Sequence, residues 1–227
     1  MKITINQREL SKHINIAQKG ISNRTTLQIL DGLLLQTVDN KLKIASTDLE
    51  ISIETFLDCQ VYEEGSIVVN SRIFGDIIKK LPDEDIDIYV EKNNINIKCN
   101  NSEFNIAASP GEDYPELPLV VENNSFSMPK DMFKEVIKQT VFATAQDETR
   151  PSLTGVLAEI VDNEVSFVAL DGYRLALKKI MLEESTGINE KIIIPGRSLV
   201  ELNKILDDSE DLFKISLSTG NIIFNLG

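Results

Sequence analysis

Few side chains in this sequence could perform covalent or metal chemistry. Asp48 and Glu50 could form a carboxylate pair for acid–base catalysis. They lie two residues apart in a strand-like run, where side chains share a face without any catalytic reason. The acidic run at 83–87 could hold a metal ion, but it follows Leu81-Pro82 and leads into an alternating segment, which favours a solvated turn. Neither group predicts an active site.

The remaining reactive side chains are one histidine and two cysteines. His13 lies between Leu10 and Ile14 at helical spacing, so we interpret it as a residue on the flank of a helix. Cys59 and Cys99 have no His or Cys neighbour at metal-ligand spacing and cannot form a disulfide framework. The sequence also lacks a phosphate-binding loop of the P-loop or dinucleotide type. It therefore argues against an enzyme, and we expect no cofactor and no metal.

The composition indicates an ordinary globular protein with a strongly acidic balance. The 227 residues have room for one large domain or two of about 110 residues. With 23 Lys and Arg against 36 Asp and Glu, the net charge is −13, which at first argues against a nucleic-acid partner. The sequence contains no membrane-spanning run and no signal-peptide core, so we expect a cytoplasmic protein without membrane contact.

An internal repeat predicts two copies of one domain. Four pairs of segments match in the same order at nearly constant offset, which is strong evidence for duplication. Asp48 and Asp171 are equivalent in this repeat. A catalytic residue duplicated in both copies would be unusual, so a turn or packing role common to both copies explains them better. The matched pairs are 40–48 with 163–171, 71–81 with 196–206, 24–27 with 150–153 and 94–97 with 221–224.

We predict an α+β fold of two duplicated domains, each with two helices packed on antiparallel sheets. Domain one covers 1–118, a linker covers 119–128, and domain two covers 129–227, since four of the seven prolines fall between Ser109 and Pro129. Ser71 and Ser198 are expected as caps of the second helix in each copy. The closing strand predicted at 102–109 has no counterpart before Gly227, so we expect a truncated second domain with an exposed sheet edge.

The positive charge is concentrated on the four predicted helices. Segments 7–20, 71–81, 129–142 and 196–206 carry 11 positive and 5 negative residues, or +6, which leaves −19 for the rest of the chain. The cations recur at steps of four and seven, so each helix has a basic stripe, and we interpret the four stripes as being in register. Such stripes suit the phosphate backbone of nucleic acid. They include Lys12, Lys79, Lys134, Lys138 and Lys204.

Four motifs resemble the family of bacterial DNA sliding clamps, the beta subunits of DNA polymerase III. They are Arg24-Thr-Thr-Leu-Gln-Ile-Leu30, Ser46-Thr-Asp-Leu-Glu-Ile51, Tyr114-Pro-Glu-Leu-Pro118 and Ala169-Leu-Asp-Gly-Tyr-Arg-Leu-Ala176. The resemblance implies a DNA-clamp fold of three domains, of which this chain would contain the first two. Two complete chains would form a closed ring around duplex DNA and tether the replicative polymerase. Without the third domain, we expect this chain to be a monomer.

The resemblance also implies two kinds of functional site. Contacts with duplex DNA, independent of its sequence, are implied for Arg24, Arg72, Gln146 and Arg150, with Arg197 as the repeat equivalent of Arg72. Pro151 and Ser152 stand where relatives commonly have aromatic residues. A pocket for short peptides of the polymerase III alpha subunit, the clamp loader and other clamp-binding proteins is implied for Leu153, Leu170, Tyr173, Arg174 and Leu175.

Two other classes of function stay open at this point. One is a structural or interaction repeat protein that binds no DNA, and the basic stripes argue against it. The other is a hydrolase that uses carboxylates such as Asp48 or Asp171. The clamp hypothesis places the protein on the bacterial nucleoid, in the cytoplasm, as a non-catalytic accessory subunit of the polymerase.

Overall fold

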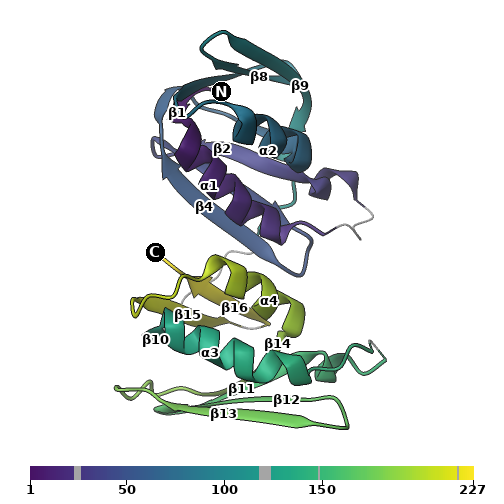
Figure 1. Cartoon of the computed structure of the whole chain (residues 1–227), viewed down its shortest axis with the longest axis vertical. Coiled ribbons are helices and arrows are strands. Elements are labelled where there is room, and N and C mark those ends of the chain that lie inside the picture. Colours follow the sequence, from purple (N-terminus) through teal and green to yellow (C-terminus); the bar gives the residue numbers. More distant parts are fainter. Residues whose placement is uncertain (23–26, 118–123, 148, 219) are drawn as a thin grey trace. The chain divides into compact units, whose positions relative to one another are not determined.

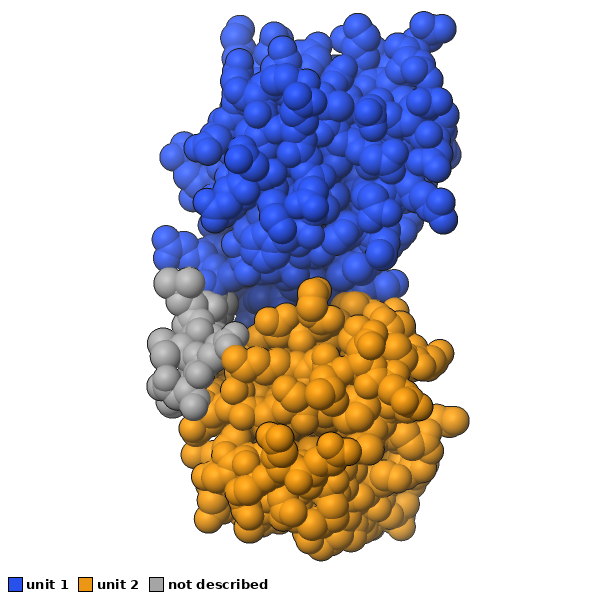
Figure 2. Space-filling view, turned by 90° about the vertical axis from the view of Figure 1, so that its left-hand side faces the viewer, with its two compact units in different colours: residues 1–117 blue, residues 118–227 orange. Residues whose placement is uncertain are grey.

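A computed structural model describes residues 1–22, 27–117, 124–147, 149–218 and 220–227. The chain separates into two compact units, residues 1–117 and residues 118–227, which Figure 2 shows in different colours. Arg24, one of the predicted DNA contacts, lies outside the described residues. No helix in the described part of the chain is long and apolar enough to cross a membrane.

Unit 1 contains one nine-stranded antiparallel sheet in the order β4-β3-β2-β6-β9-β8-β7-β1-β5. The strand β9 joins the two halves of the sheet, because its residues 102–107 pair with β8 and its residues 108–110 pair with β6. This closing strand confirms the one predicted at 102–109. The strands are β1 Lys2–Asn6, β2 Gly32–Val38, β3 Lys41–Thr47, β4 Ser52–Asp58, β5 Gln60–Glu63, β6 Ser66–Asn70, β7 Asp85–Glu91, β8 Asn94–Cys99 and β9 Ser102–Pro110.

Two helices pack on one face of this sheet (Figure 1). Helix α1, Gln7–Ala17, contacts β3, β4 and helix α2, Ser71–Lys80. The buried positions of α1 recur at helical spacing and face the core. Asn70 caps α2, since its side-chain oxygen accepts a hydrogen bond from the backbone N–H of Ile73 at 3.0 Å. The prediction of Ser71 as the cap is wrong, because Ser71 is the first residue inside the helix.

Unit 2 repeats the arrangement with two separate sheets (Figure 1). Helix α3, Lys130–Thr140, packs against a four-stranded sheet of order β13-β12-β11-β14 and against helix α4, Gly196–Ile205. A second sheet has the order β10-β15-β16. The strands are β10 Asn124–Pro129, β11 Gly155–Val161, β12 Glu164–Leu170, β13 Leu175–Met181, β14 Asn189–Pro195, β15 Leu212–Ser218 and β16 Asn221–Asn225.

Several predicted boundaries require correction. Residues 124–128, which we assigned to a linker, form part of β10 and pair with β15. Helices α1 and α3 end earlier than predicted and continue as 3₁₀ turns, η1 at Gln18–Gly20 and η4 at Val141–Ala143. Ser198 is the third residue of α4, whose N-cap position is occupied by Pro195 without a side-chain hydrogen bond, so the prediction of Ser198 as a cap is also wrong.

Each strand of unit 2 has a counterpart in unit 1, which confirms the repeat. The strands β2, β3 and β4 coincide with β11, β12 and β13 after a shift of 123 residues, and α2 coincides with α4 after a shift of 125. The units differ at β5 and β9, which have no counterpart strand among the described residues of unit 2. Among the described residues, β14 pairs only with β11 and β16 only with β15, whereas β9 pairs with both equivalent strands of unit 1. Accordingly Ile97 is buried, but its equivalent Phe224 is only half-buried.

Aromatic packing forms the centre of the unit 2 core. The ring of Phe133 on α3 is fully buried and lies 5.8 Å from the ring of Phe167 and 5.4 Å from that of Phe213, centre to centre, in edge-to-face geometry. It also lies 5.5 Å from the ring of Phe224. Such pairs add specific attraction to the burial of apolar surface. Phe133 therefore links the helix to both sheets of the unit.

Candidate functional site

The two repeated aspartates form the same turn in both units. In unit 1, the carboxylate of Asp48 accepts hydrogen bonds from the backbone N–H groups of Glu50 at 3.1 Å and Ile51 at 2.8 Å. In unit 2, Asp171 accepts from the N–H groups of Tyr173 at 2.9 Å and Arg174 at 3.1 Å. These contacts confirm the interpretation of the pair as turn residues. A carboxylate held in this way has a structural task and is a poor candidate for a hydrolytic base.

In unit 2, this turn also holds a charged side chain. Nε of Arg174 donates to the Asp171 carboxylate at 3.0 Å, and the Arg174 guanidinium lies 5.6 Å from the centre of the Phe142 ring. The pKa of Asp171 is lowered, first by the backbone N–H of Tyr173 and further by the N–H groups and positive charge of Arg174. Tyr173 at the tip of the turn is 99% exposed. The turn therefore presents an arginine held by Asp171 beside a fully accessible tyrosine.

The predicted pocket residues gather at one end of the four-stranded sheet. Leu153 precedes β11, Leu170 ends β12, and Leu175 begins β13 directly opposite Leu170. Leu153 and Leu170 are half-buried, while Leu175 is exposed. Tyr173 and Arg174 lie in the turn between β12 and β13. The structure thus places all five predicted residues at the same sheet end.

A row of apolar side chains extends this site across the outer face of the sheet. Leu177, Val168, Leu157 and Ile193 lie opposite one another on four adjacent strands. Leu177 and Ile193 are exposed, and the other two are half-buried. This row is not among the residues predicted from the sequence. Apolar residues at the outward positions of alternating strands, where polar residues are usual, were the available signal.

The equivalent face of unit 1 is covered by the chain itself. Tyr114, only 6% exposed, packs with Leu30 and Val68, and Val68 is the repeat equivalent of Ile193. The Tyr114 hydroxyl accepts a hydrogen bond from the backbone N–H of Thr47 at 2.9 Å. An exposed apolar row is therefore a property of unit 2 and not a requirement of the fold.

Most of the predicted cations lie on the solvent side of the helices. In unit 1, Lys12 on α1 and both Arg72 and Lys79 on α2 are exposed. In unit 2, Lys138 on α3 and both Arg197 and Lys204 on α4 are exposed, and Lys204 forms an ion pair with Glu201 at 2.7 Å. Gln146 and Arg150, in the segment that follows η4, are exposed as well.

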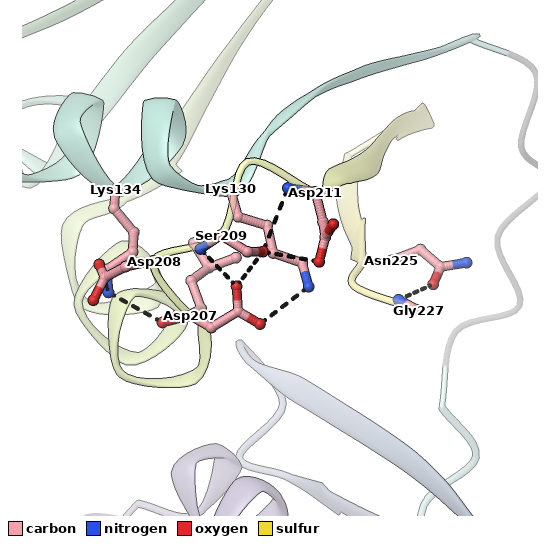
Figure 3. Close-up of polar contacts among 9 residues, drawn as sticks. Lys130, Lys134, Asp207, Asp208, Ser209, Asp211, Asn225 and Gly227 are labelled. Atoms are coloured by element: carbon pink, nitrogen blue, oxygen red, sulfur yellow. Dashed lines mark hydrogen bonds and ion pairs between the residues drawn. The ribbon is translucent and has the colours of Figure 1, made fainter.

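Lys134 differs from this group because it forms an ion pair and a hydrogen bond with the acidic loop at 206–211 (Figure 3). Its ammonium group lies 2.6 Å from the carboxylate of Asp208 and 3.2 Å from the carbonyl oxygen of Leu206. Lys130 pairs with Asp207 in the same loop at 3.3 Å, and the backbone oxygen of Asp211 accepts from the N–H of Lys130. The side chain of Lys134 is 22% exposed. This lysine is therefore occupied by contacts with the loop and offers less charge to solvent than the exposed Lys138 does.

The basic stripes of α1 and α3 also occupy different positions, contrary to the register we predicted. The buried residues Leu10 and Ile14 of α1 match Phe133 and Ile137 of α3. By the same shift of 123 residues, Lys12 corresponds to Glu135. The cations recur within each helix at the predicted spacing. Equal spacing does not determine, however, how the charged stripe is placed relative to the buried face of the helix.

The described residues contain no group of three or more His, Cys, Asp or Glu side chains that could hold a metal ion. His13 contacts the Thr55 hydroxyl at 2.5 Å, and burial is the first cause of its lowered pKa, followed by the charge of Lys12. Cys99 is buried and Cys59 half-buried, and burial raises the pKa of both thiols.

Comparison with known proteins agrees with this architecture. Residues 1–118 match the family model of the DNA polymerase III beta subunit, N-terminal domain, and residues 127–227 match that of the central domain. The chain is 36% identical to the beta sliding clamp of Bacillus subtilis over 233 residues, which covers 99% of this chain and 62% of that protein. It is 38% identical to the clamp of Staphylococcus epidermidis over 236 residues, covering 100% and 62%.

Solved structures show the same likeness. The crystal structure of the DNA polymerase sliding clamp from Bacillus subtilis superimposes with a TM-score of 0.96 at 35% identity, over 99% of this chain and 62% of that one. Repeated α+β domains with paired helices on antiparallel sheets define a DNA-clamp fold. The chain belongs to the bacterial beta sliding clamp family, the beta subunits of DNA polymerase III. It spans about three fifths of the length of the relatives it matches.

Proposed function

We propose that this chain provides the N-terminal and central domains of a non-catalytic processivity clamp, which holds duplex DNA and tethers DNA polymerase III on the bacterial nucleoid in the cytoplasm. The match of both domains to the beta subunit family carries this proposal. The exposed cations of α1, α2, α3 and α4 support it, because cations held on a rigid scaffold suit the phosphate backbone without reading sequence. In the complete protein, two chains would close a ring around DNA.

Each contact proposed between a cation and DNA is weak and independent of the DNA sequence. Each Arg or Lys pairs loosely with phosphate, and a clamp that slides needs no contact with base edges. Outside a closed ring, this chain should therefore bind duplex DNA with a dissociation constant of roughly 10⁻⁴ to 10⁻⁶ M, and rising salt should abolish the binding. Salt-insensitive or sequence-specific binding would contradict this function.

Two neighbouring lysines of α3 should respond differently to charge reversal. We expect Lys138→Glu to weaken duplex binding and to lower the salt slope by about one, because Lys138 is exposed. Lys134→Glu should leave the slope nearly unchanged and instead lower the free energy of unfolding, by about 1–3 kcal/mol, because it places two carboxylates together and removes the hydrogen bond to Leu206. Fluorescence anisotropy of a labelled duplex and urea denaturation measure the two effects.

The second part of the proposal is a partner site at the sheet end formed by Leu153, Leu170, Tyr173, Arg174 and Leu175. Apolar walls with a few polar groups at the rim are typical of peptide grooves. The partners are the polymerase III alpha subunit, the clamp loader and other proteins with clamp-binding motifs. The exposed row Leu177, Val168, Leu157 and Ile193 continues the apolar surface.

Removing the tyrosine side chain should test this site. We expect Tyr173→Ala to weaken binding of a C-terminal peptide from a polymerase III alpha subunit by about tenfold, because the ring is free to cover the peptide and is 99% exposed without one. Isothermal titration calorimetry measures the affinity. Tyr62→Ala, which removes an exposed tyrosine of unit 1, is the control and should have no effect. Equal affinity of wild type and Tyr173→Ala would contradict the site.

A further inference from the structure

Phe142 is an aromatic side chain that does not belong to the hydrophobic core of unit 2. It lies in η4, directly after α3, and 58% of it is exposed. The neighbouring residues Val141 and Ala143 pack toward the core of unit 2, whereas Phe142 points away from it. The guanidinium of Arg174 lies 5.6 Å from the centre of its ring. This distance is within the range of a cation–π contact.

Arg174 is therefore held at two points. Asp171 accepts a hydrogen bond from Nε at 3.0 Å, and the Phe142 ring lies against the guanidinium. The side chain is still 56% exposed. Since Nε is the guanidinium atom that Asp171 engages, the two terminal nitrogens keep their N–H groups available at the rim of the site. Two parallel N–H groups of this kind match the two oxygens of a carboxylate.

The fold itself does not require this arrangement. After the shift of 123 residues, Arg174 corresponds to Ile51 and Phe142 to Lys19 in unit 1. The turn nevertheless forms there, with Asp48 accepting from the N–H of Ile51. Phe142 and Arg174 are thus an addition to unit 2, located at the sheet end that carries the candidate partner site.

We propose that Phe142 is a positioning residue for Arg174, and that the guanidinium they present binds an acidic side chain of the partner peptide. The proposal rests on the proposed function, since the peptide site must exist for the arginine to serve it. Phe142 restricts the guanidinium to a plane, so less side-chain freedom is lost when the carboxylate binds. The charge of Arg174 is then satisfied by Asp171 on one edge and by the peptide on the other.

The test compares two peptides on four proteins. One peptide is taken from the C-terminus of a polymerase III alpha subunit and carries a single aspartate, and the other has asparagine at that position. Both are titrated into wild type, Phe142→Leu, Phe142→Tyr and Arg174→Lys.

We expect wild type to prefer the aspartate peptide by about tenfold, as a charge-assisted pair would. Phe142→Leu should reduce this preference by about two- to fivefold, and Phe142→Tyr, which restores the ring, should retain it. Arg174→Lys should abolish most of the preference, because lysine lacks the planar pair of donors.

A second measurement separates positioning from a loss of structure. The ¹⁵N relaxation of Arg174 Nε should show a rigid guanidinium in wild type and Phe142→Tyr, and a mobile one in Phe142→Leu, with unchanged thermal unfolding. Equal affinity of wild type for the two peptides, an unaltered preference in Phe142→Leu, or an equally rigid Nε in that variant would each overturn the inference. Binding of neither peptide to wild type would instead overturn the proposed partner site, and the inference with it.

Discussion

Phe133→Ala should unfold unit 2 at a much lower denaturant concentration while unit 1 keeps its stability. Phe133 is fully buried and meets the rings of Phe167, Phe213 and Phe224. Truncation of a buried phenylalanine costs about 3–5 kcal/mol, from lost burial and from the cavity that remains. Because the side chain joins α3 to both sheets, the cavity cannot be filled by a small shift of one element. Urea denaturation followed by circular dichroism measures the loss.

Two further variants act as controls for this result. Phe74→Ala removes a fully buried phenylalanine of unit 1 and should shift the transition of that unit instead. Phe142→Ala removes an exposed ring and should change the free energy of unfolding by about 0.5 kcal/mol or less. A loss below about 1 kcal/mol in Phe133→Ala would contradict the central position of this residue in the core.

Arg72→Glu combined with Lys79→Glu should nearly eliminate binding of duplex DNA. Both side chains are exposed on α2, seven residues apart and so on nearly the same face. Loss of two phosphate contacts lowers the salt slope by about two and the affinity by roughly a hundredfold at about 50 mM salt. The measurement is anisotropy of a labelled duplex at several salt concentrations.

A matched change elsewhere in unit 1 separates local contacts from net charge. Lys92→Glu with Lys98→Glu makes the same change in charge on exposed residues of the β7–β8 hairpin, away from the helices. We expect at most a severalfold loss from this pair, through long-range repulsion that salt screens. An equal loss in both double variants would mean that net charge, and not the helix surface, governs binding.

The repeat and the helix faces could be predicted from the sequence because both depend on local pattern. Leu10 and Ile14 recur at helical spacing, and burial of that face requires little beyond an apolar partner. Asp48 and Asp171 could be recognised as turn residues because an aspartate bonds to backbone groups two and three residues on. The caps at Ser71 and Ser198 failed because each helix starts one or more residues away from the position assumed.

Local pattern was enough to establish two copies of one α+β domain, a concentration of cations on helices, and a resemblance to a clamp. Which of those cations face solvent depends on contacts that form only when the chain folds. Lys134 was equivalent to Lys138 by spacing, yet Asp208, 74 residues away in the chain, captures it. Arg174 meets Phe142 in the same way, across 32 residues. A long side chain is directed by the partner that folding brings to it, and periodicity along the chain contains no information about that partner.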